Sequence, residues 1–211
     1  MPPKPKYKAA IFDLDGTLID SRADISAALN WARSQSGLEE LPLKKVLPMI
    51  GHGLPSLIKK GFADSPFDPD TKVPLAMEHY LRHPCRFSSL YPGVLDTLAS
   101  LSIPMAIVSN KPSQLIEPVL ELTSLKPHFE LRFGGEDFPH RKPHPAAAVH
   151  CCEHWGFAPE QVLMVGDMEP DADFAKNAGM KFAFCSYGYS SQSIEADHHL
   201  NSFSECATLF S

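Results

Sequence analysis

The chain has 211 residues, 44% of them hydrophobic and 21% charged, and a formal net charge of −6. This length and composition are typical of one globular core with an insertion rather than two independent domains. The negative charge gives no electrostatic reason to expect a nucleic-acid partner or an anionic membrane. The apolar runs are also far shorter than a membrane span.

The N-terminal segment and the cysteines bear on cellular location. Residues 1–8 are rich in Pro and Lys but lack the apolar stretch of a signal peptide. The five cysteines are odd in number and form no C-x-x-C pair, which favours reduced thiols. We therefore expect a cytoplasmic protein.

The first predicted element is a buried strand over residues 7–13, which runs into two aspartates, Asp13 and Asp15. Residues two apart in a strand point to the same face, so both carboxylates should project together from the strand end. Two carboxylates in one place repel each other unless a cation or a shared proton is present. Gly16 provides the backbone freedom for a sharp exit. This pattern indicates a catalytic site.

Residues 21–88 show only helical periodicity, interrupted by Gly51-His52-Gly53 and by several prolines. Ser21 is expected to cap the first of these helices, with Asp24 three residues later as its capping-box partner. We predict an all-helical insertion of three or four helices.

After residues 91–93 the pattern alternates between helices and strands. Strands are expected at 104–108, 131–133, 161–165 and 181–185, and helices at 94–101, 115–120, 145–155 and 171–178. The alternation predicts an α/β fold with a parallel sheet between helices. In such sheets ligands bind at the carboxyl ends of the strands, which is where the polar clusters fall: Asp13 and Asp15, Ser109 to Lys111, Lys142, and Asp167.

These strand-end residues suit phosphoryl transfer. Asp13 and Asp167 offer the oxygen ligands that Mg²⁺ prefers, and a carboxylate can also be a nucleophile that forms an aspartyl-phosphate. Asp15 is placed to protonate a leaving alkoxide and later to activate water. Lys142 and the Ser109 hydroxyl would hold phosphate oxygens.

The ordered motifs resemble those of haloacid dehalogenase superfamily phosphatases, most closely the phosphoglycolate phosphatase group. The resemblance spans nearly the whole chain and rests on FDLDGTLIDS at 12–21, GHG at 51–53, YPGV at 91–94, VSNKP at 108–112, GGED at 134–137, KPHP at 142–145, VGDMEPDADFAKNAG at 165–179 and YGY at 187–189. It implies a Rossmann-like catalytic core at 1–20 and 89–211, with a helical cap inserted at 21–88.

The resemblance also implies the metal site. Asp13 is the nucleophile and a Mg²⁺ ligand, and Asp15 is the acid/base whose backbone carbonyl also binds the metal. Asp167 is the third metal ligand, with Asp171 supporting it. From the residues alone, Asp171 stays open between this role and capping of the following helix.

Phosphate binding is expected from residues of the neighbouring loops. By resemblance, Ser109 and Asn110 bind phosphate, and Lys142 steadies Asp13 and the phosphate. Thr17 supports the loop and is counted with the phosphate-binding residues. Ser109 is also compatible with capping the helix after it.

Substrate selection is expected from the cap. His52 should lie over the site and contact the substrate. The cap cations Lys59, Lys60 and Arg86 either pair with a substrate carboxylate or are solvated. Met168 is a departure from the group, which usually has Ser or Thr there.

We predict a Mg²⁺-dependent phosphatase that hydrolyses a small phosphomonoester through an aspartyl-phosphate, with 2-phosphoglycolate as the leading candidate. The alternatives are a sugar-phosphate phosphatase, a hexose-phosphate mutase of the same superfamily, and a non-catalytic regulator that binds a phosphometabolite. The pair of Asp13 and Asp15 disfavours a regulator, and Asp15 disfavours a dehalogenase, which needs no second acid. The expected partner is a small phosphorylated metabolite, bound by a monomer or homodimer.

Overall fold

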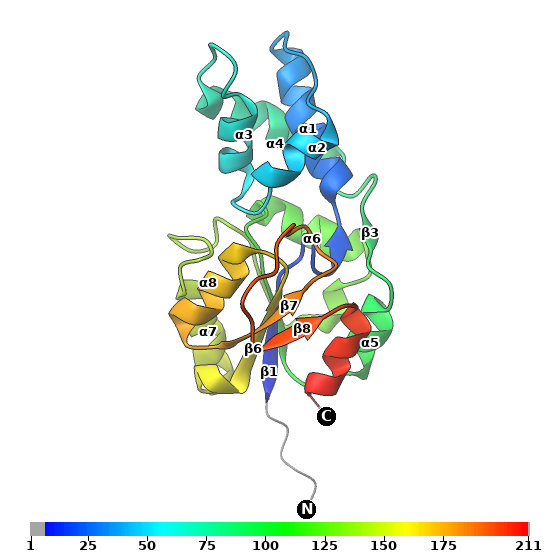
Figure 1. Cartoon of the computed structure of the whole chain (residues 1–211), viewed down its shortest axis with the longest axis vertical. Coiled ribbons are helices and arrows are strands. Elements are labelled where there is room, and N and C mark those ends of the chain that lie inside the picture. The colour runs from blue at the N-terminus through cyan, green and yellow to red at the C-terminus, as the bar shows by residue number, and fades with distance from the viewer. Residues whose placement is uncertain (1–6, 211) are drawn as a thin grey trace, which may run out of the picture.

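The structure, a computed structural model, describes residues 7–210, so most of the Pro- and Lys-rich N-terminal segment lies outside it. A parallel sheet with helices on both sides forms one end of the molecule, and a group of helices covers the other end (Figure 1). No helix of the described residues is both long and apolar enough to span a membrane.

The sheet has six strands, and every neighbouring pair is parallel. Their order across the sheet is β5 (Leu131–Phe133), β4 (Met105–Val108), β1 (Ala9–Phe12), β6 (Val162–Gly166), β7 (Lys181–Cys185) and β8 (His198–Leu200). The predicted α/β fold class is therefore confirmed. Strand β8 was not predicted, because its two histidines do not give the apolar pattern of a buried strand.

Apolar residues fill both faces of the sheet because successive strand residues point to opposite sides. On one face, Phe12 of β1 packs in a cluster with residues of α5 (Val94–Ser100) and α6 (Ser113–Leu122). On the other face, Ile11 packs with residues of α7 (Ala146–Trp155) and α8 (Glu169–Ala178). The β1 strand is thus covered on both sides and lies between β4 and β6, which fixes the position of the residues that follow it.

The helices of residues 21–88, here called the cap, form a third apolar cluster. They are α1 (Arg22–Gln35), α2 (Leu43–Val46), α3 (Leu54–Gly61) and α4 (Val73–Arg82), as expected for the helical insertion. The cluster also contains Leu115 of α6, so the cap packs against the core. Figure 1 shows the cap above the carboxyl end of the sheet.

Two short antiparallel strands join the cap to the core. They are β2 (Ile19–Asp20) and β3 (Ser89–Leu90), one before and one after the cap helices. The buried Asp24 carboxylate strengthens this neck by accepting hydrogen bonds from the backbone amides of Phe87 and Ser88 and from the Ser88 hydroxyl.

Ser21 is the N-cap residue of α1, as predicted, but the predicted capping box with Asp24 does not form. Ser21 does precede α1, but its side chain makes no capping hydrogen bond. Its hydroxyl instead donates to Asp15 Oδ1. Asp24 likewise turns to the returning chain at Phe87 and Ser88 rather than to the helix start. Both side chains bind groups outside the helix start. A local sequence pattern does not predict such contacts.

Candidate active site

Three neighbouring strands bring the predicted residues to one place. Asp13 and Asp15 follow β1, Ser109 to Lys111 follow β4, and Asp167 follows β6. Because β4, β1 and β6 are adjacent and parallel, their carboxyl ends meet at the same edge of the sheet. The expectation that these loops converge agrees with the sheet order.

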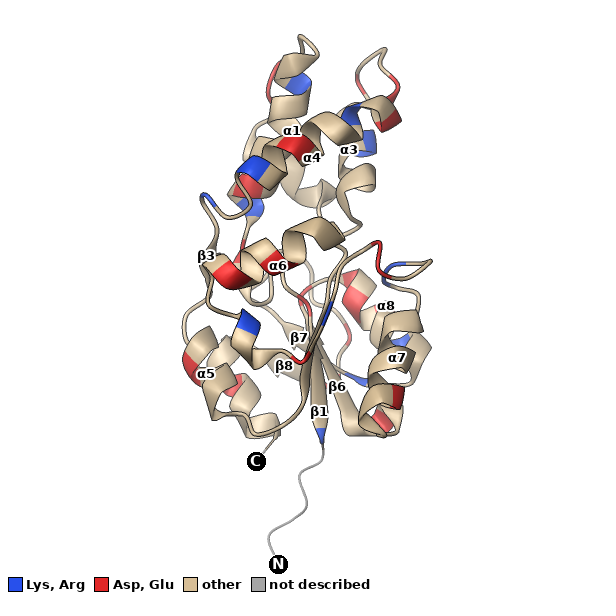
Figure 2. Cartoon of the chain, turned by 180° about the vertical axis from the view of Figure 1, so that it is seen from behind, with Lys and Arg blue, Asp and Glu red and all other residues tan. Residues whose placement is uncertain are grey.

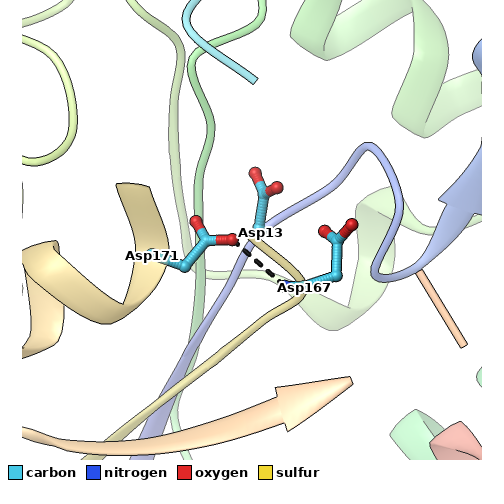
Figure 3. A group of neighbouring side chains, drawn as sticks. All are labelled: Asp13, Asp167 and Asp171. Atoms are coloured by element: carbon cyan, nitrogen blue, oxygen red, sulfur yellow. Dashed lines mark hydrogen bonds between the residues drawn. The ribbon is translucent and has the colours of Figure 1, made fainter. Parts of the chain in front are cut away.

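Three carboxylates gather at this edge. Asp13, Asp167 and Asp171 each offer an oxygen within 4.8 Å of the others, and all three are buried. In Figure 3 the carboxylates of Asp13 and Asp167 point in the same direction, while Asp171 reaches in from the start of α8. Such a cluster needs positive charge close by.

Lys142 supplies part of that charge. Its ammonium group donates to Asp13 Oδ1 at 2.8 Å and to Asp171 Oδ1 at 2.7 Å. The other oxygen of Asp171 accepts from the backbone amides of Asp167 and Met168, at 3.1 and 3.0 Å. Asp171 therefore satisfies amides at the start of α8 and also holds Lys142. It does so from inside the helix, which begins two residues earlier than expected, at Glu169.

Asp167 is fixed by donors from two loops. The Thr17 hydroxyl donates to its Oδ1 at 3.0 Å, and the Tyr189 amide donates to its Oδ2 at 2.7 Å. Gly16 and Gly188 lie so close that a Cβ atom on either would come within 2.3 Å of the Asp167 side chain. Thr17 thus contacts Asp167 in this structure and is not among the residues that line the cavity between core and cap.

Asp15 is held by a different set of residues. Lys111 Nζ lies 2.9 and 3.2 Å from its two carboxylate oxygens, and the Ser21 hydroxyl donates to Oδ1. The Tyr189 hydroxyl lies 3.1 Å from Ser21 Oγ. Asp15 is therefore oriented by other partners than Asp13.

The sequence analysis gave no role to Lys111 beyond its place at a strand end. Its side chain is 1% exposed, which is rare for a lysine unless it is paired. The available signal was its position directly after a fully buried strand and the Ser-Asn pair, in a loop expected to face the site.

The local charges perturb the titration of these groups. Burial raises the pKa of Asp13 to about 6, although the Lys142 ammonium opposes this rise. Burial and the neighbouring Asp171 and Asp13 carboxylates raise the pKa of Asp167 well above its usual range. Burial lowers the pKa of Lys142, but Asp13 and Asp171 outweigh it, so the net direction is upward.

The site carries an excess of negative charge. Four carboxylates, those of Asp13, Asp15, Asp167 and Asp171, face the two ammonium groups of Lys111 and Lys142, which leaves two negative charges uncompensated. One divalent cation would balance them. The donor set consists of oxygens, with no His or Cys in the carboxylate group, which fits Mg²⁺ better than zinc.

The loop after β4 contributes Ser109 and Asn110, both buried. Ser109 Oγ accepts from the Lys111 amide at 3.2 Å and does not cap α6, which begins after Pro112. Asn110 Nδ2 donates to the Gly51 carbonyl of the cap at 2.9 Å and to the Lys142 carbonyl at 3.1 Å. Asn110 thus connects cap and core, a function that the sequence did not indicate.

A cavity of about 50 Å³ lies between core and cap. Its core side is formed by Asp13, Asp15, Ser109, Asn110, Lys111 and Lys142, so the structure brings most of the predicted catalytic and phosphate-binding residues together. The cap side is mainly apolar and is formed by Ile25, Ile50, Leu54 and Leu57, together with Tyr80.

His52 and the cap cations considered in the sequence analysis lie outside the lining of this cavity. His52 is exposed and is not in the cavity lining, although its neighbours Gly51 and Gly53 are. Its backbone carbonyl accepts from Arg141 at 3.4 Å. The cations Lys59, Lys60 and Arg86 are exposed and also lie outside the lining. Tyr80, which the sequence analysis did not single out, lines the cavity instead.

Comparisons with known proteins agree with this geometry. The family model for haloacid dehalogenase-like hydrolases matches residues 10–185. A phosphoglycolate phosphatase from Chromobacterium violaceum is 34% identical over 209 residues, covering 94% of each chain. One from Aquifex aeolicus is 36% identical over 185 residues, covering 86% of each chain.

The fold is similar to that of solved structures as well. The crystal structure of a predicted phosphoglycolate phosphatase from Haemophilus somnus aligns with a TM-score of 0.91 and 28% identity. The alignment covers 97% of this chain and 98% of that one, so the similarity includes both the sheet and the cap.

Proposed function

Because the chain belongs to the haloacid dehalogenase-like hydrolase family, we propose that it is a Mg²⁺-dependent phosphatase that hydrolyses 2-phosphoglycolate through a phosphorylated Asp13. The family resemblance is confirmed, as is the predicted class of enzyme, a hydrolase of phosphoric monoesters. The observation that carries the mechanism is the pairing of buried Asp13 with Lys142 beside a second, separately held acid, Asp15.

Asp13 and Asp167 would hold the Mg²⁺ ion, with the backbone carbonyl of Asp15 as a further ligand by family resemblance. The two uncompensated negative charges at this edge support a divalent ion there. When bound, Mg²⁺ would draw a phosphate oxygen toward Asp13 and offset the charge that develops on it. Thr17 and Tyr189 orient Asp167 for this task.

In the first step, a carboxylate oxygen of Asp13 attacks the phosphorus atom, and the bond from phosphorus to the ester oxygen breaks. Lys142 holds Asp13 through Oδ1 and places positive charge beside the transferring group. Asp15 donates a proton to the departing oxygen, which leaves as an alcohol.

In the second step, Asp15 accepts a proton from a water molecule, and that water attacks the phosphorus atom of phosphorylated Asp13. The bond between Asp13 and phosphorus breaks, inorganic phosphate forms, and Asp15 is protonated again. Ser109 lines the cavity beside these groups and is placed to donate to a phosphate oxygen.

We assign this chemistry to the core, residues 1–20 and 89–211, and substrate selection to the cap, residues 21–88. Similarity to phosphoglycolate phosphatases favours 2-phosphoglycolate over the substrates of the sugar-phosphate phosphatase and mutase alternatives. The nucleophile and acid pair argues against a purely binding role. The cytoplasmic location and the monomer or homodimer state stay predictions.

Release of inorganic phosphate from a panel of phosphorylated metabolites tests the function. We expect activity on 2-phosphoglycolate that disappears in EDTA and returns with Mg²⁺, while Ca²⁺, which is larger and more flexible in coordination, inhibits. Full activity in metal-free buffer would contradict the metal assignment.

Trapping of the intermediate tests the mechanism. Asp15→Asn enzyme, mixed with an ester whose leaving group departs without a proton and then quenched in acid, should carry one phosphoryl group on the peptide that contains Asp13. Asp13→Asn enzyme should carry none and turn over no ester. Phosphate found on Ser109 would refute the assignment.

A further inference from the structure

The part of the cavity formed by the cap offers little for a polar substrate. Ile25, Ile50, Leu54 and Leu57 contribute apolar side chains, and the cap cations Lys59, Lys60 and Arg86 are outside the lining. Among the described cap residues that line the cavity, Tyr80 on α4 is the one with a polar side-chain atom. Tyr80 therefore supplies the polar side-chain atom at this end of the cavity.

The Tyr80 hydroxyl has a donor but no acceptor. Its side chain is buried, and its one hydrogen bond among the described residues is to Lys111 Nζ. An ammonium group has no lone pair, so Tyr80 accepts in this bond and its own proton remains to be donated. A buried donor without an acceptor is costly, and this one belongs to a residue that lines the cavity.

Lys111 places positive charge at the same point. Its Nζ lies near Asp15 and Tyr80 Oη, and its side chain is 1% exposed. The other donors in the lining, Ser109, Asn110 and Lys142, lie on the core side around Asp13. The cavity thus has two separate groups of donors, one around the nucleophile and one formed by Lys111 and Tyr80.

We propose that Lys111 and Tyr80 form a subsite for a second anionic group, a carboxylate, on a small phosphorylated acid. The Tyr80 hydroxyl donates to one carboxylate oxygen, and the Lys111 ammonium pairs with the same group from the core side. This subsite rests on the proposed phosphatase function and adds a basis for substrate selection. It uses one cap residue and one core residue, so the subsite is complete only when the two parts are in contact.

Burial supports the donor role of Tyr80. It raises the pKa of Tyr80 above its usual value, so the phenol keeps its proton at neutral pH. Esters without a carboxylate leave this proton without an acceptor and gain nothing from Lys111. The subsite therefore predicts selectivity between esters that differ in this one group.

The test compares Tyr80→Phe with the wild-type enzyme on 2-phosphoglycolate and on ethyl phosphate, which lacks the carboxylate. Tyr80→Phe should lower kcat/KM for 2-phosphoglycolate by about 10- to 100-fold, the usual effect of losing a hydrogen bond to a charged group. The value for ethyl phosphate should change by less than about twofold, because nothing in that ester reaches the hydroxyl.

Tyr91→Phe is the matched control. The Tyr91 hydroxyl is also buried and has no hydrogen-bond partner among the described residues, and Tyr91 does not line the cavity. Removal of this hydroxyl should leave kcat/KM unchanged for both substrates.

Inhibition gives a second measurement that does not depend on catalysis. In Tyr80→Phe, inhibition by 3-phosphonopropionate should weaken, while inhibition by propylphosphonate, which lacks the carboxylate, should not.

The outcomes separate this inference from the proposed function. Equal losses on both esters, or a wild-type enzyme that prefers neither ester, would overturn the subsite and leave the phosphatase assignment intact. A selective loss on 2-phosphoglycolate, together with the selective loss of inhibition, would support it. No hydrolysis of any phosphomonoester in the presence of Mg²⁺ would overturn the proposed function itself.

Discussion

The buried carboxylate of Asp13 is expected to lower the stability of the folded protein when no metal is bound. The side chain is buried near Asp167 and Asp171, and Lys142 compensates only part of this negative charge. Burial raises the pKa of Asp13 from 3.8 to about 6. The ionised form is therefore destabilised in the folded protein relative to the unfolded chain.

This pKa shift predicts that Asp13→Asn raises the free energy of unfolding in metal-free buffer, by an amount that depends on pH. The folded state binds the Asp13 proton more tightly, so wild-type stability falls as pH rises from about 4 through about 6. Asparagine has no carboxyl group to ionise, so the variant does not lose stability in this way. Urea unfolding in EDTA should show Asp13→Asn more stable than wild type by about 2–3 kcal/mol at pH 8, with the difference closing near pH 4.

The matched control is Asp173→Asn at an exposed position of α8, which should change the free energy of unfolding by less than about 0.5 kcal/mol. If the stability gain of Asp13→Asn stayed constant from pH 4 to 8, ionisation of Asp13 would not be the cause of the pH dependence.

Thr17 offers a test of the metal site at the same scale. Its buried hydroxyl donates to Asp167, and Thr17→Val removes this bond with little change of volume. Because groups that orient a metal ligand typically affect affinity by 10- to 100-fold, the Mg²⁺ concentration for half-maximal activity should rise by about that factor. Thr123→Val, which removes a buried hydroxyl bonded to Val119 O in α6, should leave the Mg²⁺ requirement unchanged. Equal effects from both variants would contradict the prediction.

The sequence indicated some residues of the site and missed others for a physical reason. Asp13, Asp15 and Asp167 follow strands, and strand ends converge in any parallel sheet, so their grouping follows from local pattern and fold class. Tyr80 lies on a helix whose facing side depends on how the cap packs. His52 was expected over the site because it lies in a glycine turn, yet that turn presents its backbone to Arg141.

At the scale of elements, strands were predicted best where apolar residues run into glycine or polar turn residues. Residues 131–133 and 181–185 form strands with the predicted bounds. Strand β8 was missed because His198-His199-Leu200 lacks the apolar pattern of a buried strand. Helix α8 begins before its predicted start at Asp171, since Pro170 fits the first helical turn, where its missing amide hydrogen is not needed.

The neck between β2 and β3 predicts a large effect for Asp24→Ala. The buried carboxylate accepts from two backbone amides and the Ser88 hydroxyl, and alanine would leave those donors without their partner. We expect a loss of about 2–4 kcal/mol in the free energy of unfolding, measured by urea titration. Asp173→Ala, at an exposed position on α8, should change it by less than about 0.5 kcal/mol. Similar small losses for both would show that the neck does not depend on Asp24.

At the scale of the whole molecule, the contact between cap and core decides what the site encloses. Leu115 of α6 joins the apolar cluster of the cap, Tyr80 reaches Lys111, and Asn110 reaches the Gly51 carbonyl. In Figure 2, the positions of basic and acidic residues are interspersed along the ribbon of both parts. The sequence predicted helices in residues 21–88, but how they dock on the core depends on pairs far apart in the chain.

Asn110 gives the sharpest test of that docking. Its side-chain amide bridges the Gly51 carbonyl of the cap and the Lys142 carbonyl of the core, so Asn110→Ala should loosen the closed arrangement. Hydrogen exchange should become faster in residues 50–54, and kcat/KM should fall by about tenfold, in line with the loss of one or two hydrogen bonds. The fall should be larger for 2-phosphoglycolate than for ethyl phosphate, because the proposed subsite of Tyr80 and Lys111 is complete only when cap and core are in contact.

Asn30→Ala is the matched control for this variant. The Asn30 amide exchanges two hydrogen bonds with the Leu41 backbone, at 2.9 Å each, and both lie within the cap. Loss of these bonds should destabilise the whole cap. Hydrogen exchange in residues 50–54 should then be accelerated no more than in the rest of the cap. If Asn110→Ala instead lowered activity with unchanged exchange in that segment, Asn110 would act on phosphate directly, as its place in the VSNKP motif predicts, and not through the cap.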